Sequence, residues 1–469
     1  MDEQQRPDQR PANPRRRQRS KAQVFKEAYL PVLIAGTALL LIIVFIIGSI
    51  VRGIQRSKIE AQASLEASVS EAIELELLTQ EANTLAKDAA ALAAHFNYEN
   101  ALQLLDTFSG DINKFPTLSQ LRTEYAQAKD AMVLWSDPSQ VVNLSMQLLI
   151  ADPVRAYQDK TYGTSYNRNF VTTDEFSKIL QQLYDNGYIL ISMSDILSGN
   201  ATKELYLPSG KKPLILTQTQ VNYYTYMTDS DGDKLPDKGG AGFASKLIVD
   251  TNGNLICEMV DSFGQTVTGA YDLVPILDAF IQAHPDFSYK GAKAILAVTG
   301  YDGLFGYRTG SQARAVFGDA YCDEQVQAVS KIVDALRNTG YEIAFHTYEN
   351  VAYGSYSAAQ IQADLNKWSA EVYPILGSID MLVYARNSDI TGNTADYSGE
   401  KYETLKAFGF TKYLGFCTDG KPWLTTDSAY IRQGRILVTG SNMAHHSDWF
   451  TGMFDAASVL NSNRGTVPK

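Results

Sequence analysis

Cysteine and histidine are scarce in this sequence. Three cysteines in 469 residues allow at most one disulfide, with one thiol left over. Cys257, Cys322 and Cys417 are not spaced like the ligands of a zinc ribbon, so we expect small buried thiols. The five histidines leave few candidates for a catalytic or metal site.

Positive charge is also scarce beyond the first residues of the chain. The net charge is −11, but residues 1–58 carry 11 Lys or Arg against 4 Asp or Glu, which is +7. The remainder therefore carries −18. Because phosphate binding needs a positive face, this acidic body argues against nucleic acid as the partner of the main domain. Apolar residues make up 45% of the chain, enough for a large packed core.

The stretch from Pro31 to Val51 contains no charged residue in 21 positions. About 20 apolar residues span a bilayer as a helix. The run is longer than the apolar part of a usual signal peptide, and no small-residue cleavage site follows it. Eight Lys or Arg precede it, so the positive-inside rule keeps the N-terminus cytoplasmic. We predict a disordered basic tail at 1–28, a transmembrane signal-anchor helix at 29–52, and an extracytoplasmic main domain in a single-pass cell-membrane protein.

A region rich in Ala, Glu, Leu and Gln follows the apolar run. Apolar residues recur at helical spacing between 57 and 96, and further helical patterns cover 98–108 and 118–135. We therefore predict an α-helical stalk over 53–137. Pairing of two stalks as a coiled coil would make a homo-oligomer, although the apolar seam is not strictly heptad.

Strand-like and helical patterns alternate over 138–469. Examples are "TTDEFSKILQQLYDNG" as a helix, "KPLILTQTQ" as a strand, "DEQVQAVSKIVDALRNTG" as a helix and "YEIAFHTYE" as a strand. This alternation indicates parallel βαβ units in an α/β barrel or a doubly wound sheet. In either fold, ligands gather at the C-terminal ends of the strands. A β-hairpin around Asn252-Gly253 is predicted as an insertion near 244–272.

The order of these motifs resembles the polysaccharide deacetylase family with the NodB-type domain. The resemblance runs from about Asn169 to Asn442 and rests on "FVTTDEFSKILQQLYDNGYILISMSDI", "KPLILT" and "GYEIAFHTY" in that order. The segments "VNYYTYM" and "RQGR" are similar to a membrane-anchored bacterial subgroup. The resemblance implies a distorted (β/α) barrel that removes acetyl groups from sugars with the help of a zinc-like ion.

The residues that the resemblance would place at the metal are mostly replaced. In the family, the first strand ends in two aspartates, a general base and a metal ligand, where this chain has Thr219 and Gln220. A later His-x3-His supplies two more ligands, but here Asn350 follows His346. Threonine and glutamine cannot act as a general base at neutral pH, and an amide is a poor zinc ligand. We expect no zinc and no deacetylation of the family type.

Three histidines remain to be explained. His346 is either the remnant of a lost metal site or an ordinary strand-end histidine held by a backbone carbonyl. His445 and His446 are adjacent, so a regular strand would turn them to opposite sides and prevent them from chelating one metal. One of the two can still enter the pocket from a loop and form a replacement catalytic site; the alternative is an exposed loop.

An acidic loop, "DSDGDKLPDKGG", places carboxylates in the pattern D-x-D-x-D-x3-D. Alternating carboxylates in a glycine-containing loop offer hard oxygen ligands for calcium, although the pattern is not an EF-hand. The alternative is a solvated acidic turn. The calcium site would use Asp229, Asp231, Asp233 and Asp237.

Three function hypotheses follow. The first is a catalytically degenerate, membrane-anchored protein that binds cell-envelope glycan or a protein partner, with Tyr223, Arg308 and His346 as ligand-binding residues. The second is an active carbohydrate deacetylase or hydrolase that uses a non-standard site around His346 and His445 or His446. The third is a structural scaffold of the cell envelope assembled through the helical stalk.

Overall fold

The computed structural model describes residues 35–39, 41–43, 59–198, 201–391 and 396–469. The predicted basic tail, 1–28, lies outside these ranges. Of the predicted signal-anchor helix, 29–52, only 35–39 and 41–43 are described, and both pieces are helical. Across the described ranges, no helix is long and apolar enough to cross a membrane. The transmembrane prediction therefore falls mostly outside the residues that the structure describes.

The chain divides into two compact units. The first comprises Met1–Asp88 and Leu104–Leu121, and the second comprises Ala89–Gln103 and Arg122–Lys469. Three helices occupy most of the region predicted to be helical: α2 (Ile59–Ala94), α3 (Tyr98–Leu105) and α4 (Pro116–Asp130). The division does not follow the predicted boundary after residue 137, since residues 89–103 group with the second unit. Self-association through these helices stays a prediction.

Seven parallel strands of the second unit close into a barrel. Their order is β11-β12-β13-β14-β16-β2-β7, and β7 pairs again with β11 to complete the ring. The strands are β2 (Val142–Met146), β7 (Lys212–Thr219), β11 (Ile295–Val298), β12 (Glu342–Phe345), β13 (Met381–Val383), β14 (Lys412–Phe416) and β16 (Ile431–Leu437). The predicted (β/α) barrel is thus confirmed, and the doubly wound alternative is wrong.

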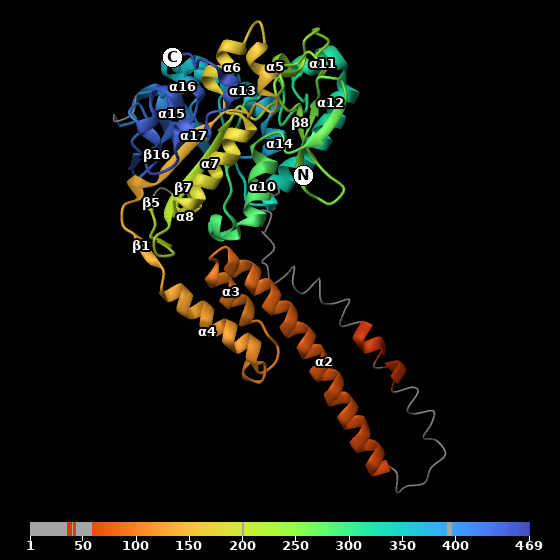
Figure 1. Ribbon diagram of the computed structural model, residues 1–469. Coiled ribbons are helices and arrows are strands. Elements are labelled where there is room, and N and C mark those ends of the chain that lie inside the picture. The colour runs from red at the N-terminus through yellow and green to blue at the C-terminus, as the bar shows by residue number, and fades with distance from the viewer. Residues whose placement is uncertain (1–34, 40, 44–58, 199–200, 392–395) are drawn as a thin grey trace, which may run out of the picture. The chain divides into compact units, whose positions relative to one another are not determined.

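Helices cover the outside of the barrel (Figure 1). The longer ones are α7 (Thr173–Asp185), α10 (Leu273–Ala283), α12 (Asp319–Asn338), α13 (Ala358–Glu371) and α15 (Gly399–Phe408). Helix α7 begins with a capping box, in which Thr172 and Glu175 each accept the other's backbone N–H. Its buried residues, Phe176, Ile179, Leu180 and Leu183, follow the helical repeat and so form one apolar face.

Shorter elements complete the fold. The short helices are α5 (Pro153–Gln158), α6 (Gly163–Asn169), α8 (Met193–Ile196), α9 (Thr225–Thr228), α11 (Ser311–Phe317), α14 (Tyr373–Leu376), α16 (Gly440–His445) and α17 (Ala456–Val459). The remaining strands are β1 (Val133–Trp135), β3 (Tyr188–Leu190), β4 (Leu197–Ser198), β5 (Ala201–Thr202), β6 (Leu205–Leu207), β8 (Lys246–Val249), β9 (Leu255–Val260), β10 (Thr266–Gly269) and β15 (Leu424–Thr426).

The predicted β-hairpin near 244–272 is a three-stranded antiparallel sheet instead. Strands β8 and β9 pair around the turn that contains Gly253, whose φ of 87° suits glycine. A second turn at residues 261–265 brings β10 against β9. The third strand was not predicted from the sequence, because Thr266 to Gly269 show no apolar alternation. In the structure, two of these four residues are exposed and two are half-buried.

Side chains alternate between the inside and the outside of the barrel along each strand. Inside, a buried apolar cluster includes Ile215, Ile295, Ala344, Val383 and Ile431. Their neighbours along the strands belong to the larger core between barrel and helices, which includes Leu216, Leu296, Phe345, Leu382 and Ile436. The barrel interior is therefore packed with apolar side chains at these positions.

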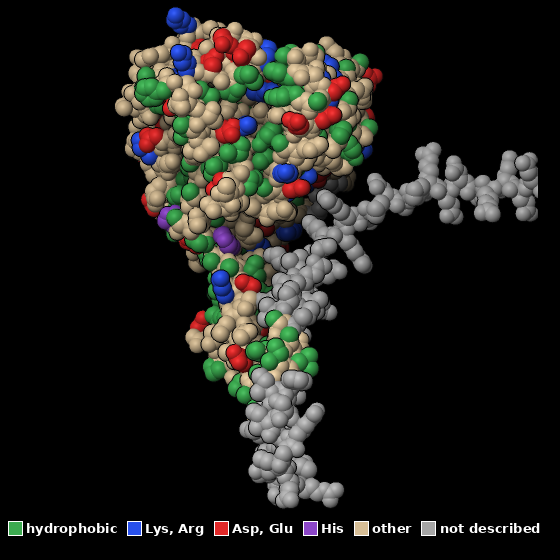
Figure 2. Space-filling model, turned by 90° about the vertical axis from the view of Figure 1, so that its right-hand side faces the viewer, with side chains coloured by type: hydrophobic (Ala, Val, Ile, Leu, Met, Phe, Trp, Pro, Cys, Tyr) green, Lys and Arg blue, Asp and Glu red, His purple; other side chains and the backbone are tan. Residues whose placement is uncertain are grey.

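The surface of the described residues carries charges of both signs. On the face shown in Figure 2, Asp and Glu side chains alternate with Lys and Arg side chains among hydrophobic and uncharged groups. This view of the described residues shows no broad basic area of the kind that a nucleic-acid-binding face presents.

Candidate functional site

Inside the barrel, polar side chains follow the apolar layer towards the C-terminal ends of the strands. The Asn143 amide donates to Gln433 Oε1 at 3.0 Å and accepts the Thr217 hydroxyl at 2.8 Å. Gln433 Nε2 donates to the Val141 carbonyl at 3.2 Å. These three buried side chains satisfy one another, which a low-dielectric interior requires of polar groups. They form a fixed floor for the layer above.

Above this floor, a cavity of about 370 Å³ lies at the C-terminal ends of β2, β7, β12 and β16. This is the end of a parallel barrel where ligands bind. We call it the barrel pocket. Its lining consists of Ser145, Met146, Gln147, Asn169, Thr219, Gln220, His346, Asn350, Tyr384, Arg386, Asn387, Arg435, Leu437 and Thr439. The four residues that the family resemblance assigned to a vestigial site, Thr219, Gln220, His346 and Asn350, are thus brought together.

His346 directly follows β12 and is held in one orientation. Its backbone N–H donates to the Val298 carbonyl at 2.9 Å, and its Nδ1 lies 2.8 Å from the Val383 carbonyl oxygen. Since a carbonyl can only accept, Nδ1 carries the proton and Nε2 is left as an acceptor. Burial, reinforced by the positive charge of Arg435, lowers the pKa of His346 to about 3. The imidazole is therefore neutral at physiological pH.

Thr219 and Gln220 end β7. The Thr219 hydroxyl is buried and lies 3.4 Å from the Met146 carbonyl, a long hydrogen bond. Gln220 has a φ of 62°, so the chain turns sharply out of the strand at this residue. Neither side chain can abstract a proton from water at neutral pH. Both can exchange hydrogen bonds with a ligand.

Asn350 lies on the loop after His346, where the resemblance expects the second ligand histidine. Its φ is 53°, and its backbone carbonyl accepts from Arg386 Nε at 2.6 Å. Within the described residues, its side-chain Oδ1 is buried without a hydrogen-bond partner. A buried acceptor left unpaired costs about 1–3 kcal/mol, so a donor from a ligand would be favourable here.

Arg435 is the residue of the barrel pocket that sequence reasoning missed. It points inward from β16, two residues after Gln433, and is 1% exposed. Its guanidinium donates to the Gly415 carbonyl at 2.8 Å, the Ser145 hydroxyl at 2.9 Å and the Tyr384 carbonyl at 3.0 Å. Burial lowers its pKa to about 10, which leaves it charged at neutral pH. Arg435 is the last residue of the segment "RQGR", but the resemblance assigned it no role in the site.

The residues of the barrel pocket do not fit the zinc ion that the family resemblance implies. A catalytic zinc site usually needs three protein ligands, drawn from His, Cys, Asp and Glu. Of such residues, His346 is the one member of the lining, and Arg435 places a positive charge in the same cavity. The lining of the barrel pocket therefore does not support a metal-assisted reaction.

Two other residues predicted to bind sugar make hydrogen bonds within the fold, and sugar binding by them stays a prediction. Tyr223 is 1% exposed, and its hydroxyl donates to Asp272 Oδ2 at 2.7 Å. Arg308 is 6% exposed and donates to the carbonyls of Asp302 and Tyr223, both at 2.6 Å. Neither lines the barrel pocket. Both hold the loops that follow β7 and β11.

The histidine pair of the predicted replacement site also lies outside the barrel pocket. His445 ends α16, is exposed, and has its Nε2 3.1 Å from the Val467 carbonyl. His446 is exposed and stacks on Trp449, with ring centroids 4.7 Å apart. The structure therefore gives the replacement site no histidine besides His346 in the lining.

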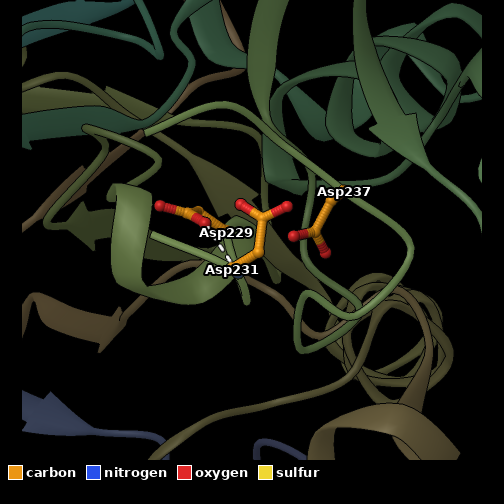
Figure 3. Close-up of side chains that lie close together, drawn as sticks. All are labelled: Asp229, Asp231 and Asp237. Carbon is orange, nitrogen blue, oxygen red and sulfur yellow. Dashed lines mark hydrogen bonds between the residues drawn. The ribbon is translucent and has the colours of Figure 1, made fainter. Parts of the chain in front are cut away.

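Three of the four predicted calcium ligands come together in the acidic loop (Figure 3). Ligand oxygens of Asp229, Asp231 and Asp237 all lie within 4.8 Å of one another, and in this view Asp231 lies between the other two. Asp233 is not part of the cluster. The carboxylates also shape the loop: Asp229 accepts the backbone N–H groups of Gly232 and Lys234 at 2.7 and 2.9 Å. Calcium binding stays a prediction.

A larger cavity, about 610 Å³, lies at the opposite end of the barrel. Its lining includes the first residues of β12, β13 and β14, which are Glu342, Met381 and Lys412. Burial raises the pKa of Glu342 to about 7. Because ligands of parallel barrels bind at the C-terminal ends of the strands, we place the candidate site in the barrel pocket and not here.

The closed parallel barrel is consistent with the (β/α) barrel that the resemblance implies. No family model matches the chain, and no curated protein matches it. Among solved structures, it is similar to the Streptococcus pyogenes deacetylase PplD in complex with acetate. The identity is 14%, the TM-score is 0.36, and the match covers 66% of this chain and 95% of that one.

A second similar structure is a de-N-acetylase from Aggregatibacter actinomycetemcomitans. The identity is 12%, the TM-score is 0.34, and the match covers 64% of this chain and 95% of that one. We take the function from the barrel pocket and not from these neighbours.

Proposed function

We propose that this protein is a membrane-anchored, extracytoplasmic member of the deacetylase-like barrels that has lost catalysis and binds cell-envelope carbohydrate. One observation carries the proposal: the barrel pocket is lined by hydrogen-bonding side chains but contains no carboxylate in its lining. A pocket of this kind can bind hydroxyl and amide groups, yet it has neither a general base nor the ligands for a metal-bound water. The anchor rests on the uncharged run from Pro31 to Val51.

Glycan binding in the barrel pocket is tested with the full chain and acetylated chito-oligomers, by isothermal titration. Asn169, the last residue of α6, lines the pocket, so Asn169→Trp should obstruct it and weaken binding roughly tenfold or more, about 1.4 kcal/mol. The matched control is Arg168→Trp on the same helix, since Arg168 is exposed and not in the lining. Equal affinity of both variants, or no binding by the natural protein, would contradict glycan binding in this pocket.

Loss of catalysis is tested by zinc content and acetate release. We expect the full chain to purify without stoichiometric zinc and to release no acetate from acetylated chito-oligomers. The combined variant Thr219→Asp, Gln220→Asp and Asn350→His should gain zinc, because it supplies two carboxylates and a second imidazole beside His346. Aspartate also tolerates the positive φ at position 220.

The control for that variant is Thr219→Asn, Gln220→Asn and Asn350→Gln, which changes the same positions without adding a zinc ligand. Stoichiometric zinc or acetate release by the natural protein would overturn the proposed loss of catalysis. The alternative of an active enzyme with a non-standard site would then apply, with His346 as its candidate catalytic residue.

A further inference from the structure

Arg435 differs from the other buried arginines of the described residues. Arg432, on the same strand, pairs with Asp389 at 2.9 Å, and Arg464 pairs with Glu175 at 2.5 Å. Arg308 lies 3.7 Å from a carboxylate oxygen of Asp302. Among the ion pairs that described residues form, none includes Arg435. Within the described ranges, Arg435 is the buried arginine that has no acidic partner, and it lines the barrel pocket.

An unpaired buried cation is costly, because burial removes water without supplying a counter-charge. Arg435 recovers part of this cost through its neutral partners, Gly415, Ser145 and Tyr384. A guanidinium has five N–H groups, and these three bonds use three of them. Among the described residues, the other two N–H groups have no hydrogen-bond acceptor, and Arg435 lines the cavity with no carboxylate to balance its charge.

The rest of the lining adds to this positive character and supplies no negative charge. Arg386 contributes a second guanidinium, exposed at the rim, and the lining holds no Asp or Glu. Neutral His346, whose Nε2 is an acceptor, and Asn350 line the same cavity. The complement of this lining is a ligand that presents an anionic group to Arg435 and hydroxyl donors to His346 and Asn350.

We propose that the barrel pocket binds an anionic sugar, in which a carboxylate or phosphate pairs with Arg435 and hydroxyl groups bond to His346 and Asn350. This inference rests on the proposed function and narrows its ligand class. Arginine suits both anions, since its planar N–H groups match two oxygens at once. A cavity of about 370 Å³ lies at the small end of ligand sites, roughly 300–1,000 Å³, and so favours a single sugar unit.

The test compares sugars that differ only in charge, at neutral pH, on the full chain. Glucuronic acid and glucose form one matched pair, because a carboxylate replaces a hydroxymethyl group. A hexose phosphate and inorganic phosphate form the second arm and separate a phosphorylated sugar from a carboxylated one. We expect the natural protein to prefer an anionic sugar over glucose by roughly thirtyfold or more. Arg435→Gln should erase this preference, whereas Arg168→Gln, an exposed control outside the lining, should keep it.

Each outcome decides the inference. No preference for charge in the natural protein, while chito-oligomers still bind, overturns the inference and leaves the proposed function standing. If no sugar binds at all, both fail. A preference that survives in Arg435→Gln also overturns it and leaves Arg435 as a structural residue of the barrel. If Arg435→Gln does not fold, Asn169→Trp is tested in its place. We expect Asn169→Trp to lose binding of the anionic sugar. Unchanged binding of the anionic sugar by this variant would overturn the proposed site.

Discussion

A histidine with a protonated Nδ1 held by a carbonyl is a fixed acceptor. His346 has this arrangement with Val383, and its low pKa keeps Nε2 unprotonated. It cannot work as a general acid at neutral pH, because its proton on Nδ1 is directed away from any ligand in hydrogen-bond range of Nε2. Within the barrel pocket, His346 can therefore accept a hydrogen bond from a hydroxyl group at Nε2.

The burial of His346 predicts how stability depends on pH. Its pKa is about 3 in the folded protein, against about 6.5 in the unfolded chain. Between these values the unfolded state binds one more proton, so the neutral histidine stabilises the fold above pH 6.5 and this contribution is lost as the pH falls. Relative to His346→Asn, which does not titrate, the natural protein should lose about 2 kcal/mol of stability between pH 7 and pH 5.

Urea unfolding of both proteins across this pH range measures the difference. Parallel curves would mean that His346 is solvated enough to accept a proton in the folded state. Such a result would also weaken the case for a dry, preformed barrel pocket.

The residues of the barrel pocket show where single-sequence reasoning succeeds. Thr219, Gln220, His346 and Asn350 meet because parallel strands end at one rim, a consequence of the βαβ pattern. Arg435 was not predicted, since a buried arginine usually has an acid partner and only the three-dimensional structure shows that this one has none. Tyr223 and Arg308 lie outside the barrel pocket, because their side chains hydrogen-bond to Asp272 and to backbone carbonyls.

At the scale of elements, β16 directs side chains both into the barrel and towards its outside. Arg432 faces outward, where it pairs with Asp389 and lies over the Tyr397 ring, 4.1 Å from its centroid. Gln433 and Arg435 face inward. One strand thus carries a paired and an unpaired arginine three residues apart. The inward one, Arg435, is the residue that we propose to pair with the ligand.

The acidic loop between α9 and β8 is the element for which calcium is predicted. If calcium binds with a Kd near 1 mM, as weak extracellular sites do, then 10 mM Ca²⁺ should stabilise the fold by about 1.4 kcal/mol. Asp231→Asn should abolish this gain because Asp231 belongs to the carboxylate cluster. Asp233→Asn is the matched control, since Asp233 lies in the same loop but outside the cluster.

Thermal unfolding with Ca²⁺, with Mg²⁺ and with a chelator measures this effect. An equal response of both variants, or no response of the natural protein, would leave the loop as a solvated acidic turn whose carboxylates cap its own backbone N–H groups.

At the scale of the whole molecule, the alternation of helices and parallel strands can be predicted from local sequence patterns, whereas the closure of the sheet into a barrel cannot. Alternating helices and strands specify parallel pairing, yet a barrel and a doubly wound sheet share that pattern. The pairing of β7 with β11 decides between them, and it depends on the register of three residues, Thr217 to Thr219 against Ile295 to Ala297. The division into two units could not be predicted from the sequence either, because the continuous helix α2 shows no change of composition at residue 88.

The ring of strands is closed by its first and last members. Strand β2 pairs with β16, and Asn143 bonds to Gln433 across 290 positions of the chain. On the ribosome, a nascent chain therefore cannot complete its barrel until nearly all of it has been made. A chain exported during synthesis would still be unfolded while it crosses the membrane, as translocation requires. Truncation before β16 would remove Arg435 and leave β2 and β14 as open edges, the kind of surface that aggregates.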